Sequence, residues 1–317
     1  MVRGSRKIQP ITLRRGKQTL ELILKLSEHI YNQTGNPADV NCLNLERLLG
    51  TRLDYGTIHE HYGSKKEEIL EKYNLDVPYI ALVRADVIGQ RIEDHPLVKA
   101  RRVYSNFQPD KHDWQRFVNL PTRIGIEEAE LLGIILADGD IMFDVGTICL
   151  LGSQNHVEFY EEMVSHRIEQ VFNIPAPVVY VRRKHKGLYQ NPRIEIASKA
   201  IKTWLIDDLG FYDVNKILKF LPEKRQQIAF LEGYIAGKGT IMQESTMEIN
   251  SYRQPILEQM AELAQSLGIR TGKVHEYKYT SSMGKASTMY RIYIHSGLRE
   301  LHLLNPWHQK KLGIGPE

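Results

Sequence analysis

The same apolar phrase occurs twice in this chain, one hundred positions apart. Residues 131–141 read LLGIILADGDI and residues 231–241 read LEGYIAGKGTI, with glycines at matching places. Such a pattern predicts a buried helix that ends at a glycine. Similarity at a fixed spacing indicates duplication, and a unit of about 100 residues is far too long for a solenoid repeat. We therefore expect two related halves.

Each phrase is followed by elements in the same order, and RIEIAS at 193–198 matches RIYIHS at 291–296. For the first half the periodicity predicts helices over 127–138, 156–172 and 199–209, with strands over 140–145, 147–152, 176–185 and 192–198. For the second half it predicts helices over 226–237, 254–267 and from 298, with strands over 240–249, 273–281 and 287–296. The expected fold is α+β, with two αββαββα halves over 126–212 and 213–317 that are related by a pseudo-twofold axis.

The first 125 residues have a different composition. Residues 1–18 form a basic arm without acids, which is either a solvated tail or a polyanion-binding segment. Residues 19–75 contain short helical patterns at 19–35, 44–50 and 53–74, the last predicted to break at Gly63 and restart at Ser64. They predict a small all-α helix-turn-helix domain. Residues 76–125 show no clean period, so we expect a linker whose aromatic residues anchor it to a domain.

Other classes are disfavoured by composition. Cys42 and Cys149 are far apart and do not fit a disulfide framework or a zinc site. No apolar run has the length of a membrane span, and no secretory signal begins the chain. We therefore expect a soluble intracellular protein, cytoplasmic or associated with the nucleoid, with no membrane partner.

With both phrases in view, LLGIILADG (131–139) and LEGYIAGKG (231–239), the chain resembles the two-repeat, monomeric form of the LAGLIDADG homing endonuclease family over residues 120–312. The resemblance implies saddle-shaped antiparallel sheets on double-stranded DNA, divalent-metal hydrolysis of phosphodiesters, and intron or intein mobility. Gly133, Gly233 and Gly237 keep one face of each helix small, which permits close packing of the two helices. LDYGTIHEHYGSKKEEIL (53–70) looks like the helix-turn-helix repeat associated with such nucleases.

The resemblance places the catalytic acids directly before the terminal glycine of each motif. Asp138 fills this place in the first half and is the candidate ligand for Mg²⁺ or Mn²⁺. Lys238 fills it in the second half, where the family has an acid, and a protonated lysine does not ligate a hard cation. Nicking through Asp138 alone, slow cleavage with the ammonium in place of a metal, and loss of cleavage all stay open. Lys199 is the candidate for the family's basic active-site residue.

Alternate residues of the strands would face the DNA. The candidates are rich in Arg, Lys and Tyr, which read base edges or contact phosphate. They are Arg182, Lys184, Lys186, Tyr189, Gln190 and Arg193 in the first half and Lys273, His275, Tyr277, Tyr279, Lys285 and Arg291 in the second. In the helix-turn-helix region they are Thr57, His59 and His61.

Two functions follow from these features. The first is a site-specific DNA-binding protein of the LAGLIDADG type, with cleavage reduced to nicking or lost. The second is a non-cleaving relative that regulates transcription or takes part in RNA splicing or processing, so RNA is an alternative partner. Lys238 favours the second function and Asp138 the first.

Overall fold

The computed structural model describes residues 16–53, 55–142, 147–183, 189–243, 246–280, 286–298 and 301–313. The chain divides into two compact units. Unit 1 comprises the chain up to Val103 together with Pro109–Val118, and unit 2 comprises Tyr104–Gln108 and the chain from Asn119 onward. The chain therefore passes three times from one unit to the other. None of the helices in the described ranges combines the length and the apolar character needed to cross a membrane.

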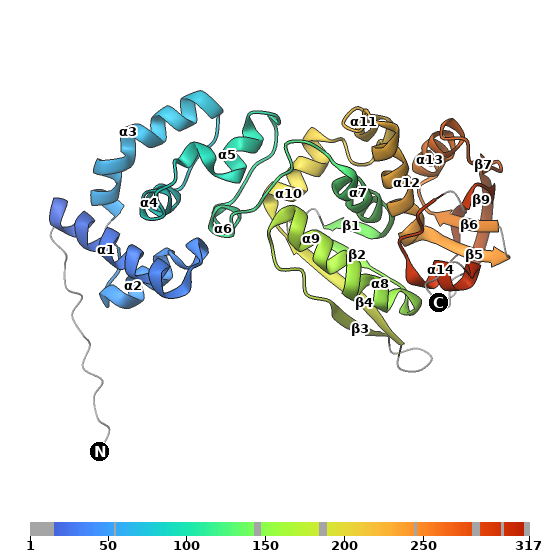
Figure 1. Ribbon diagram of the computed structural model, residues 1–317, viewed down its shortest axis with the longest axis horizontal. Coiled ribbons are helices and arrows are strands. Elements are labelled where there is room, and N and C mark those ends of the chain that lie inside the picture. The colour runs from blue at the N-terminus through green and yellow to red at the C-terminus, as the bar shows by residue number, and fades with distance from the viewer. Residues whose placement is uncertain are drawn as a thin grey trace, which may run out of the picture. The chain divides into compact units, whose positions relative to one another are not determined.

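Unit 1 is helical in its described part (Figure 1). Its elements are α1 (Lys17–Thr34), η1 (Pro37–Asp39), α2 (Cys42–Leu49), α3 (Tyr55–Tyr73), α4 (Tyr79–Val87), η2 (Ile92–Asp94), α5 (Pro96–Arg101) and α6 (Lys111–Gln115). The break expected at Gly63 is wrong, because α3 runs through it without interruption. Gly63 is buried, and a Cβ there would meet only the ring of His59, at 3.5 Å. Tertiary packing thus outweighs the cost of glycine inside a helix, about 1 kcal/mol.

The stretch 76–125, expected as a linker, is mostly packed structure. In α4 every residue from Ile80 to Ala85 is buried, and Arg84 itself is only 1% exposed. The Arg84 guanidinium donates to four backbone carbonyls, among them those of Ala38 at 3.0 Å and Gln115 at 3.1 Å. Burial lowers its pKa to about 10. Arg84 thereby ties the segments on either side of α4 to the core of unit 1.

The segment Tyr104–Gln108 belongs to unit 2. Tyr104 and Phe107 are buried there, at 3% and 0% exposure. The carboxylate of Asp208 accepts from the backbone N–H groups of Ser105, Asn106 and Phe107, at 3.1, 2.9 and 2.8 Å. A short piece of chain is thus fixed by one side chain that is one hundred residues away in sequence.

Unit 2 contains two antiparallel sheets and two central helices. The first half consists of α7 (Ile126–Asp138), β1 (Gly139–Met142), β2 (Thr147–Leu151), η3 (Gln154–His156), α8 (Val157–Phe159), the π-helical turn η4 (Tyr160–Val164), α9 (Ser165–Phe172), β3 (Val179–Arg183), β4 (Tyr189–Ala197), α10 (Lys199–Thr203) and the π-helical turn η5 (Trp204–Asp208). The second half consists of α11 (Val214–Leu218), α12 (Lys224–Lys238), β5 (Gly239–Gln243), β6 (Thr246–Ser251), α13 (Gln254–Ser266), β7 (Arg270–Thr271), β8 (His275–Thr280), β9 (Ala286–Ser296) and α14 (Pro306–Leu312).

The two sheets repeat one topology. The first has the order β1-β2-β4-β3, and in the second β5, β6 and β9 follow in the same way, with β8 paired to β9. Register repeats as well, since Gly139 pairs with Leu150 and Gly239 with Ile249. The second half adds β7 and α14. The predicted α+β fold with duplicated antiparallel sheets is thereby confirmed.

Helices α7 and α12 lie side by side at the centre of unit 2 (Figure 1). A Cβ on Gly133 would lie 2.1 Å from the carbonyl oxygen of Phe230, and one on Gly233 would lie 2.0 Å from that of Glu130. Real Cβ atoms do not approach that closely. The two backbones therefore touch, as the glycine spacing predicts, and any larger residue would separate them.

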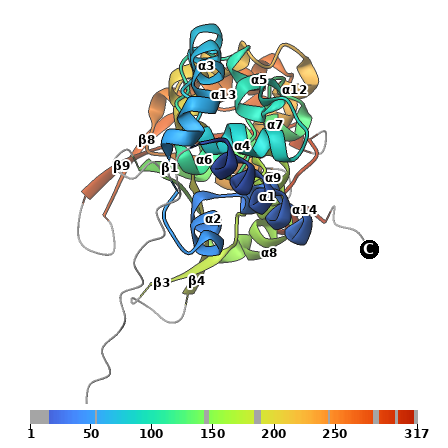
Figure 2. The ribbon, with the colours of Figure 1, turned by 90° about the vertical axis from the view of Figure 1, so that its left-hand side faces the viewer.

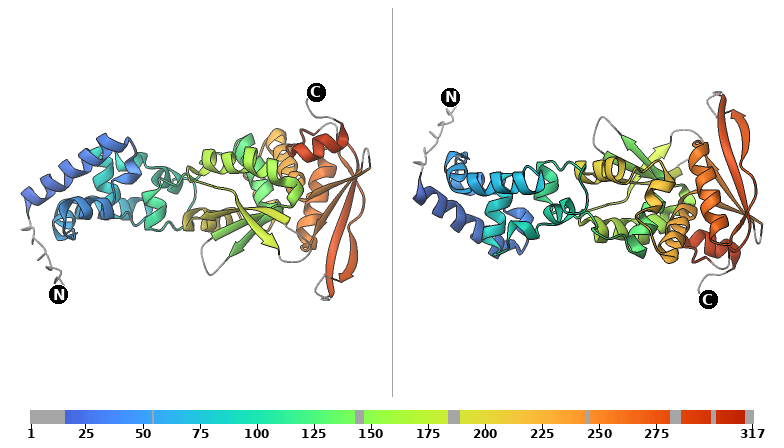
Figure 3. Two further views of the ribbon diagram at one scale, coloured as in Figure 1. Left: turned by 90° about the horizontal axis from the view of Figure 1, so that it is seen from below. Right: turned by 90° about the horizontal axis from the view of Figure 1, so that it is seen from above.

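Each sheet buries one face. In the first, Ile148, Leu150, Ile194 and Ile196 are fully buried and alternate with exposed or half-buried residues. The ribbons β3–β4 and β8–β9 project away from the central helices (Figures 2 and 3). The other face of each sheet is consequently left open.

Candidate functional site

The paired helices bring Asp138 and Lys238 together at their C-terminal ends. The Lys238 Nζ lies 3.5 Å from Asp138 Oδ1. Gly237 makes this possible, because a Cβ there would lie 2.7 Å from the Cβ of Ala137 and 2.9 Å from Asp138 Oδ2. Sequence reasoning named both residues of this ion pair, and the structure shows that they share one site.

The Asp138 carboxylate is enclosed. Its side chain is 5% exposed, whereas that of Lys238 is 35% exposed. The Tyr160 hydroxyl donates to Asp138 Oδ2 at 2.9 Å, so each carboxylate oxygen has a partner. Burial raises the pKa of Asp138 to about 6, an effect that the ammonium of Lys238 and the hydrogen bond from Tyr160 offset only in part. Burial and the neighbouring carboxylate in turn raise the pKa of Tyr160 well above its usual value.

These residues do not fit a divalent metal centre. A hard cation needs several oxygen ligands, and the two-metal nucleases hold their ions between converging carboxylates. Here one carboxylate is bonded to an ammonium and a phenol. Within the described ranges no group of three His, Cys, Asp or Glu side chains converges anywhere. The site is therefore an internal ion pair.

Lys199 is not brought to Asp138. It is exposed at the start of α10. Register explains the separation: Gly139 pairs with Leu150 and Leu150 with Ile194, and Lys199 follows only after β4 has ended at Ala197. From Ile194 to Ala197 the strand already rises about 10 Å, at about 3.3 Å per residue. The basic group expected from β4 thus lies at the far end of the sheet from the ion pair.

Two histidines near Lys238 were missed by the sequence analysis. His156 and His308 are buried, with ring centroids 5.9 Å apart, and His308 Nε2 bonds the carbonyl of Gly239 at 2.8 Å. Burial lowers the pKa of both to about 4, and Lys238 contributes at His156. Asn305, at the start of α14, donates to the carbonyl of Ala236 at 3.0 Å. Residues of α14 and its N-cap thereby supply hydrogen-bond partners for backbone carbonyls at the end of α12. No local sequence pattern indicates this role.

The open face of the second sheet gathers several candidate DNA-binding residues. His275 pairs with Arg291, so the two lie side by side. The Arg291 guanidinium lies 4.2 Å from the centre of the Tyr277 ring, donates to Tyr293 Oη at 2.9 Å and lies 3.4 Å from the Glu248 carboxylate. Arg291 is thus held in a fixed position, while Lys273 and His275 are exposed.

In the first sheet, Arg193 forms an ion pair with Glu195 on the same open face. Three candidates, Lys184, Lys186 and Lys285, lie outside the described residues. For Arg182, Tyr189, Gln190 and Tyr279 the structure describes backbone pairing alone: Arg182 with Gln190, Arg183 with Tyr189, and Tyr279 with Ser287.

The candidates on α3 are separated. Thr57 is buried, with its hydroxyl within 3.4 Å of the Gly16 N–H, whereas His59 and His61 are exposed. The His59 ring packs against Tyr79, at 5.5 Å between centroids, and His61 against Tyr62 at 4.7 Å. The three residues therefore do not form one row of exposed side chains.

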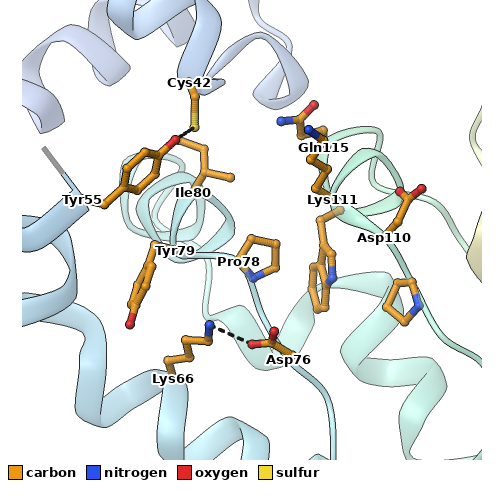
Figure 4. Close-up of a pocket in the computed structure, with 12 residues that line it drawn as sticks. Cys42, Tyr55, Lys66, Asp76, Pro78, Tyr79, Ile80, Asp110, Lys111 and Gln115 are labelled. Atoms are coloured by element: carbon orange, nitrogen blue, oxygen red, sulfur yellow. Dashed lines mark hydrogen bonds and ion pairs between the residues drawn. The ribbon is translucent and has the colours of Figure 1, made fainter. Parts of the chain in front are cut away.

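A cavity of about 420 Å³ lies in unit 1 beside α3 and α4. Tyr55 and Tyr79 line one side of it, and Asp110, Lys111 and Gln115 line the other (Figure 4). Lys66 lies over the Tyr79 ring at 4.8 Å and pairs with Asp76 at 2.8 Å. Since its acids and bases are matched in number, the cavity has no strong electrostatic preference for an anion.

The profile of the LAGLIDADG-like domain matches residues 225–302. Among solved structures, I-DmoI in complex with DNA and Mn is 20% identical, covers 56% of this chain and 91% of its own, and has a TM-score of 0.36. The N-terminal LAGLIDADG domain of DUF199/WhiA is 16% identical, with coverages of 61% and 84% and a TM-score of 0.39.

Full-length DUF199/WhiA from Thermatoga maritima is also 16% identical, with coverages of 62% and 58% and a TM-score of 0.36. No curated protein matches the sequence. The profile match covers most of the second half of unit 2, and the first half repeats the strand order of that half. Residues 225–302 are thus a LAGLIDADG-like domain, set within a duplicated α+β unit.

Proposed function

We propose that this chain is a site-specific double-stranded DNA-binding protein of the LAGLIDADG endonuclease type that no longer cuts its target by a two-metal mechanism. The observation that carries this proposal is the ion pair between Lys238 Nζ and Asp138 Oδ1, at 3.5 Å. Two-metal hydrolysis requires two carboxylates that share metal ions between them. An ammonium in place of one of them repels a divalent cation and neutralises the other.

DNA binding is supported by the open faces of the two sheets. They carry Arg193, His275 and Arg291, and Lys273 lies two residues before β8. Side chains of these types can contact base edges or phosphate. Arg291, fixed by Tyr277, Tyr293 and Glu248, would recognise a base edge with little loss of side-chain entropy. The exposed Lys273 would contact phosphate.

Unit 1 belongs to the same proposal as an accessory DNA-binding part. Its helices α2 and α3 occupy the region expected to form a helix-turn-helix, and His59 and His61 are exposed on α3. Unit 1 contains more bases than acids, and such an excess favours contact with phosphate.

Selection of binding sites tests the DNA-binding half of the proposal. The full chain is incubated with randomised DNA duplexes and, in parallel, with randomised RNA hairpins, and bound molecules are sequenced over several rounds. We expect one duplex motif to be enriched, with an affinity that falls steeply with salt. Enrichment of RNA alone would instead indicate a function in RNA processing. Enrichment of neither nucleic acid would overturn the proposal that the chain binds DNA.

Cleavage is tested on a supercoiled plasmid that carries the selected site, with Mg²⁺ or Mn²⁺. We expect no linear product from the natural chain. Lys238→Asp restores a second carboxylate beside Asp138, so this variant should bind Mn²⁺ in calorimetry and produce nicked or linear plasmid. Lys238→Met is the matched control, because it removes the ammonium without adding an oxygen ligand. Linear product from the natural chain at a rate that Asp138→Asn does not change would contradict the assignment of this site.

A further inference from the structure

A cavity of about 490 Å³ opens at the seam between the two halves of unit 2. Asp140 of β1 comes from the first half. Tyr252, Arg253, the start of α13 and Tyr290 of β9 come from the second. Asp140 is exposed and lies two residues after Asp138. The cavity is therefore next to the ion pair, and nothing in the proposed function uses it.

The walls of this cavity are aromatic and flat. Tyr212, Tyr252 and Tyr290 line it, and Tyr252 is 62% exposed. The Arg253 guanidinium lies over the Tyr212 ring with its Cζ 4.0 Å from the ring centre, which makes a planar cationic surface. Phenol rings and stacked guanidinium planes are the surfaces on which unstacked nucleobases pack.

The charges of the lining favour a neutral ring in this cavity over a phosphate. The positive charge of Arg253 is balanced by the negative charge of Asp140. The Gln254 amide already donates to the carboxylate of Glu258, at 2.8 Å. A carboxylate at the rim accepts hydrogen bonds from an exocyclic amino group, as acidic side chains do from cytosine. Cytosine and adenine both carry such an amino group, whereas thymine does not.

We propose that this cavity takes one unstacked nucleobase of the bound duplex, with a preference for a base whose exocyclic amino group can donate to Asp140, such as cytosine. The proposal rests on the DNA-binding function proposed above. Stacking a base on aromatic side chains strengthens binding by about one order of magnitude. Extruding a base from a matched duplex opposes binding, and an unpaired base opposes it least. The cavity thus makes the protein prefer a duplex with an unpaired base.

The test compares two duplexes of one sequence, of which one carries a single extra unpaired cytosine at its centre. Binding to the full chain is measured by fluorescence anisotropy at fixed salt. We expect about tenfold tighter binding of the bulged duplex, from the stacking contribution, and a smaller gain for an unpaired thymine. With 2-aminopurine as the unpaired base, fluorescence should fall on binding, because the base stacks on tyrosine.

Variants assign the effect to the cavity. Tyr252→Ala and Arg253→Gln should abolish the preference while changing affinity for the paired duplex by less than about twofold, since Tyr252 is exposed and Arg253 lies on the surface. Tyr180→Ala is the control: it removes another exposed phenol, which contacts Glu161 and is not part of the cavity. That variant should keep the preference.

Equal affinity of the natural chain for the two duplexes would overturn the nucleobase site and leave the DNA-binding proposal standing. A preference that survives both cavity variants would overturn it as well. A chain that binds neither duplex at low salt contradicts DNA binding itself, and the nucleobase site with it.

Discussion

The two halves of unit 2 share a backbone but differ in what holds the end of the central helix. In the first half, the carboxylate of Asp138 is held by the phenol of Tyr160. In the second half, α14 covers the helix end, and Asn305 and His308 bond the carbonyls of Ala236 and Gly239. The two helices still pack with the same glycine contacts.

The comparison indicates that the residues that determine the duplicated fold are not the residues that determine the chemistry at the helix ends. The helix pair needs glycine where the backbones touch and apolar residues around them. It does not need two acids at the helix ends, since an acid and a base at that place form an ion pair. The duplicated fold is therefore compatible with an acid–base pair at the ends of its two central helices.

The largest effect on stability is expected from the contact between the backbones of α7 and α12. Gly233→Ala places a Cβ 2.0 Å from the carbonyl oxygen of Glu130 and must separate the helices, so we expect a loss of more than about 4 kcal/mol in the free energy of unfolding. Gly63→Ala is the matched control, because its Cβ meets only the His59 ring at 3.5 Å. This control should be neutral or stabilising by up to about 1 kcal/mol in denaturant unfolding. Equal effects of the two substitutions would refute close backbone packing.

The next largest effect is a pH dependence of the unfolding free energy that Asp138, in the first half, contributes. The pKa of Asp138 is raised to about 6 in the folded state, so its contribution to stability is complete below pH 4 and is lost as the pH rises through 6. At 1.36 kcal/mol per pKa unit the loss is about 3 kcal/mol. The measurement is the difference in unfolding free energy between the natural chain and Asp138→Asn at several pH values.

The buried histidines titrate in the opposite sense. The pKa values of His156 and His308 are lowered to about 4, so their contribution is present at neutral pH and is lost as the pH falls. The natural chain and Asp138→Asn both contain the two histidines, so the effect of the histidines cancels in the difference between their unfolding free energies. A difference that is flat between pH 4 and pH 7 would show that Asp138 is not enclosed.

A smaller effect is expected at the ion pair. Lys238→Met leaves the Asp138 carboxylate buried without its cationic partner. Breaking a fully buried pair costs 3–5 kcal/mol, but the Lys238 side chain is 35% exposed, so we expect about 1–2 kcal/mol at pH 8. The cost should vanish at pH 4, where Asp138 is protonated. Thermal unfolding at both pH values measures it, and a cost that persists at pH 4 would assign it to lost packing.

The smallest effect concerns the open face of the second sheet. Lys273→Ala removes one expected phosphate contact, so the slope of log affinity against log salt should decrease by about 1, with little change in the preferred sequence. Lys219→Ala removes an exposed lysine that lies just after α11, outside the sheets, and should leave the slope unchanged. A slope that is the same in both variants would remove Lys273 from the proposed surface.

The sequence predicts the parts of this fold that repeat. Helices α7 and α12 are largely apolar in their C-terminal halves and carry glycines there, and this is visible without coordinates. Helix α4 was missed because every residue from Ile80 to Ala85 is buried, so this stretch shows no amphipathic period. The one charged residue within it, Arg84, donates to backbone carbonyls. Among the site residues, Asp138 and Lys238 follow from the motif. Tyr160 does not, because it lies on the π-helical turn η4, 22 residues from Asp138 in the chain, and only the tertiary fold brings the two together.

The three passages of the chain between the units restrict how this protein can be taken apart. A cut after Val103 separates Pro109–Val118, with the buried Trp114, from the rest of unit 1. A cut after Val118 separates the buried Tyr104 and Phe107 from the rest of unit 2. No single break yields two pieces that each contain a complete interior.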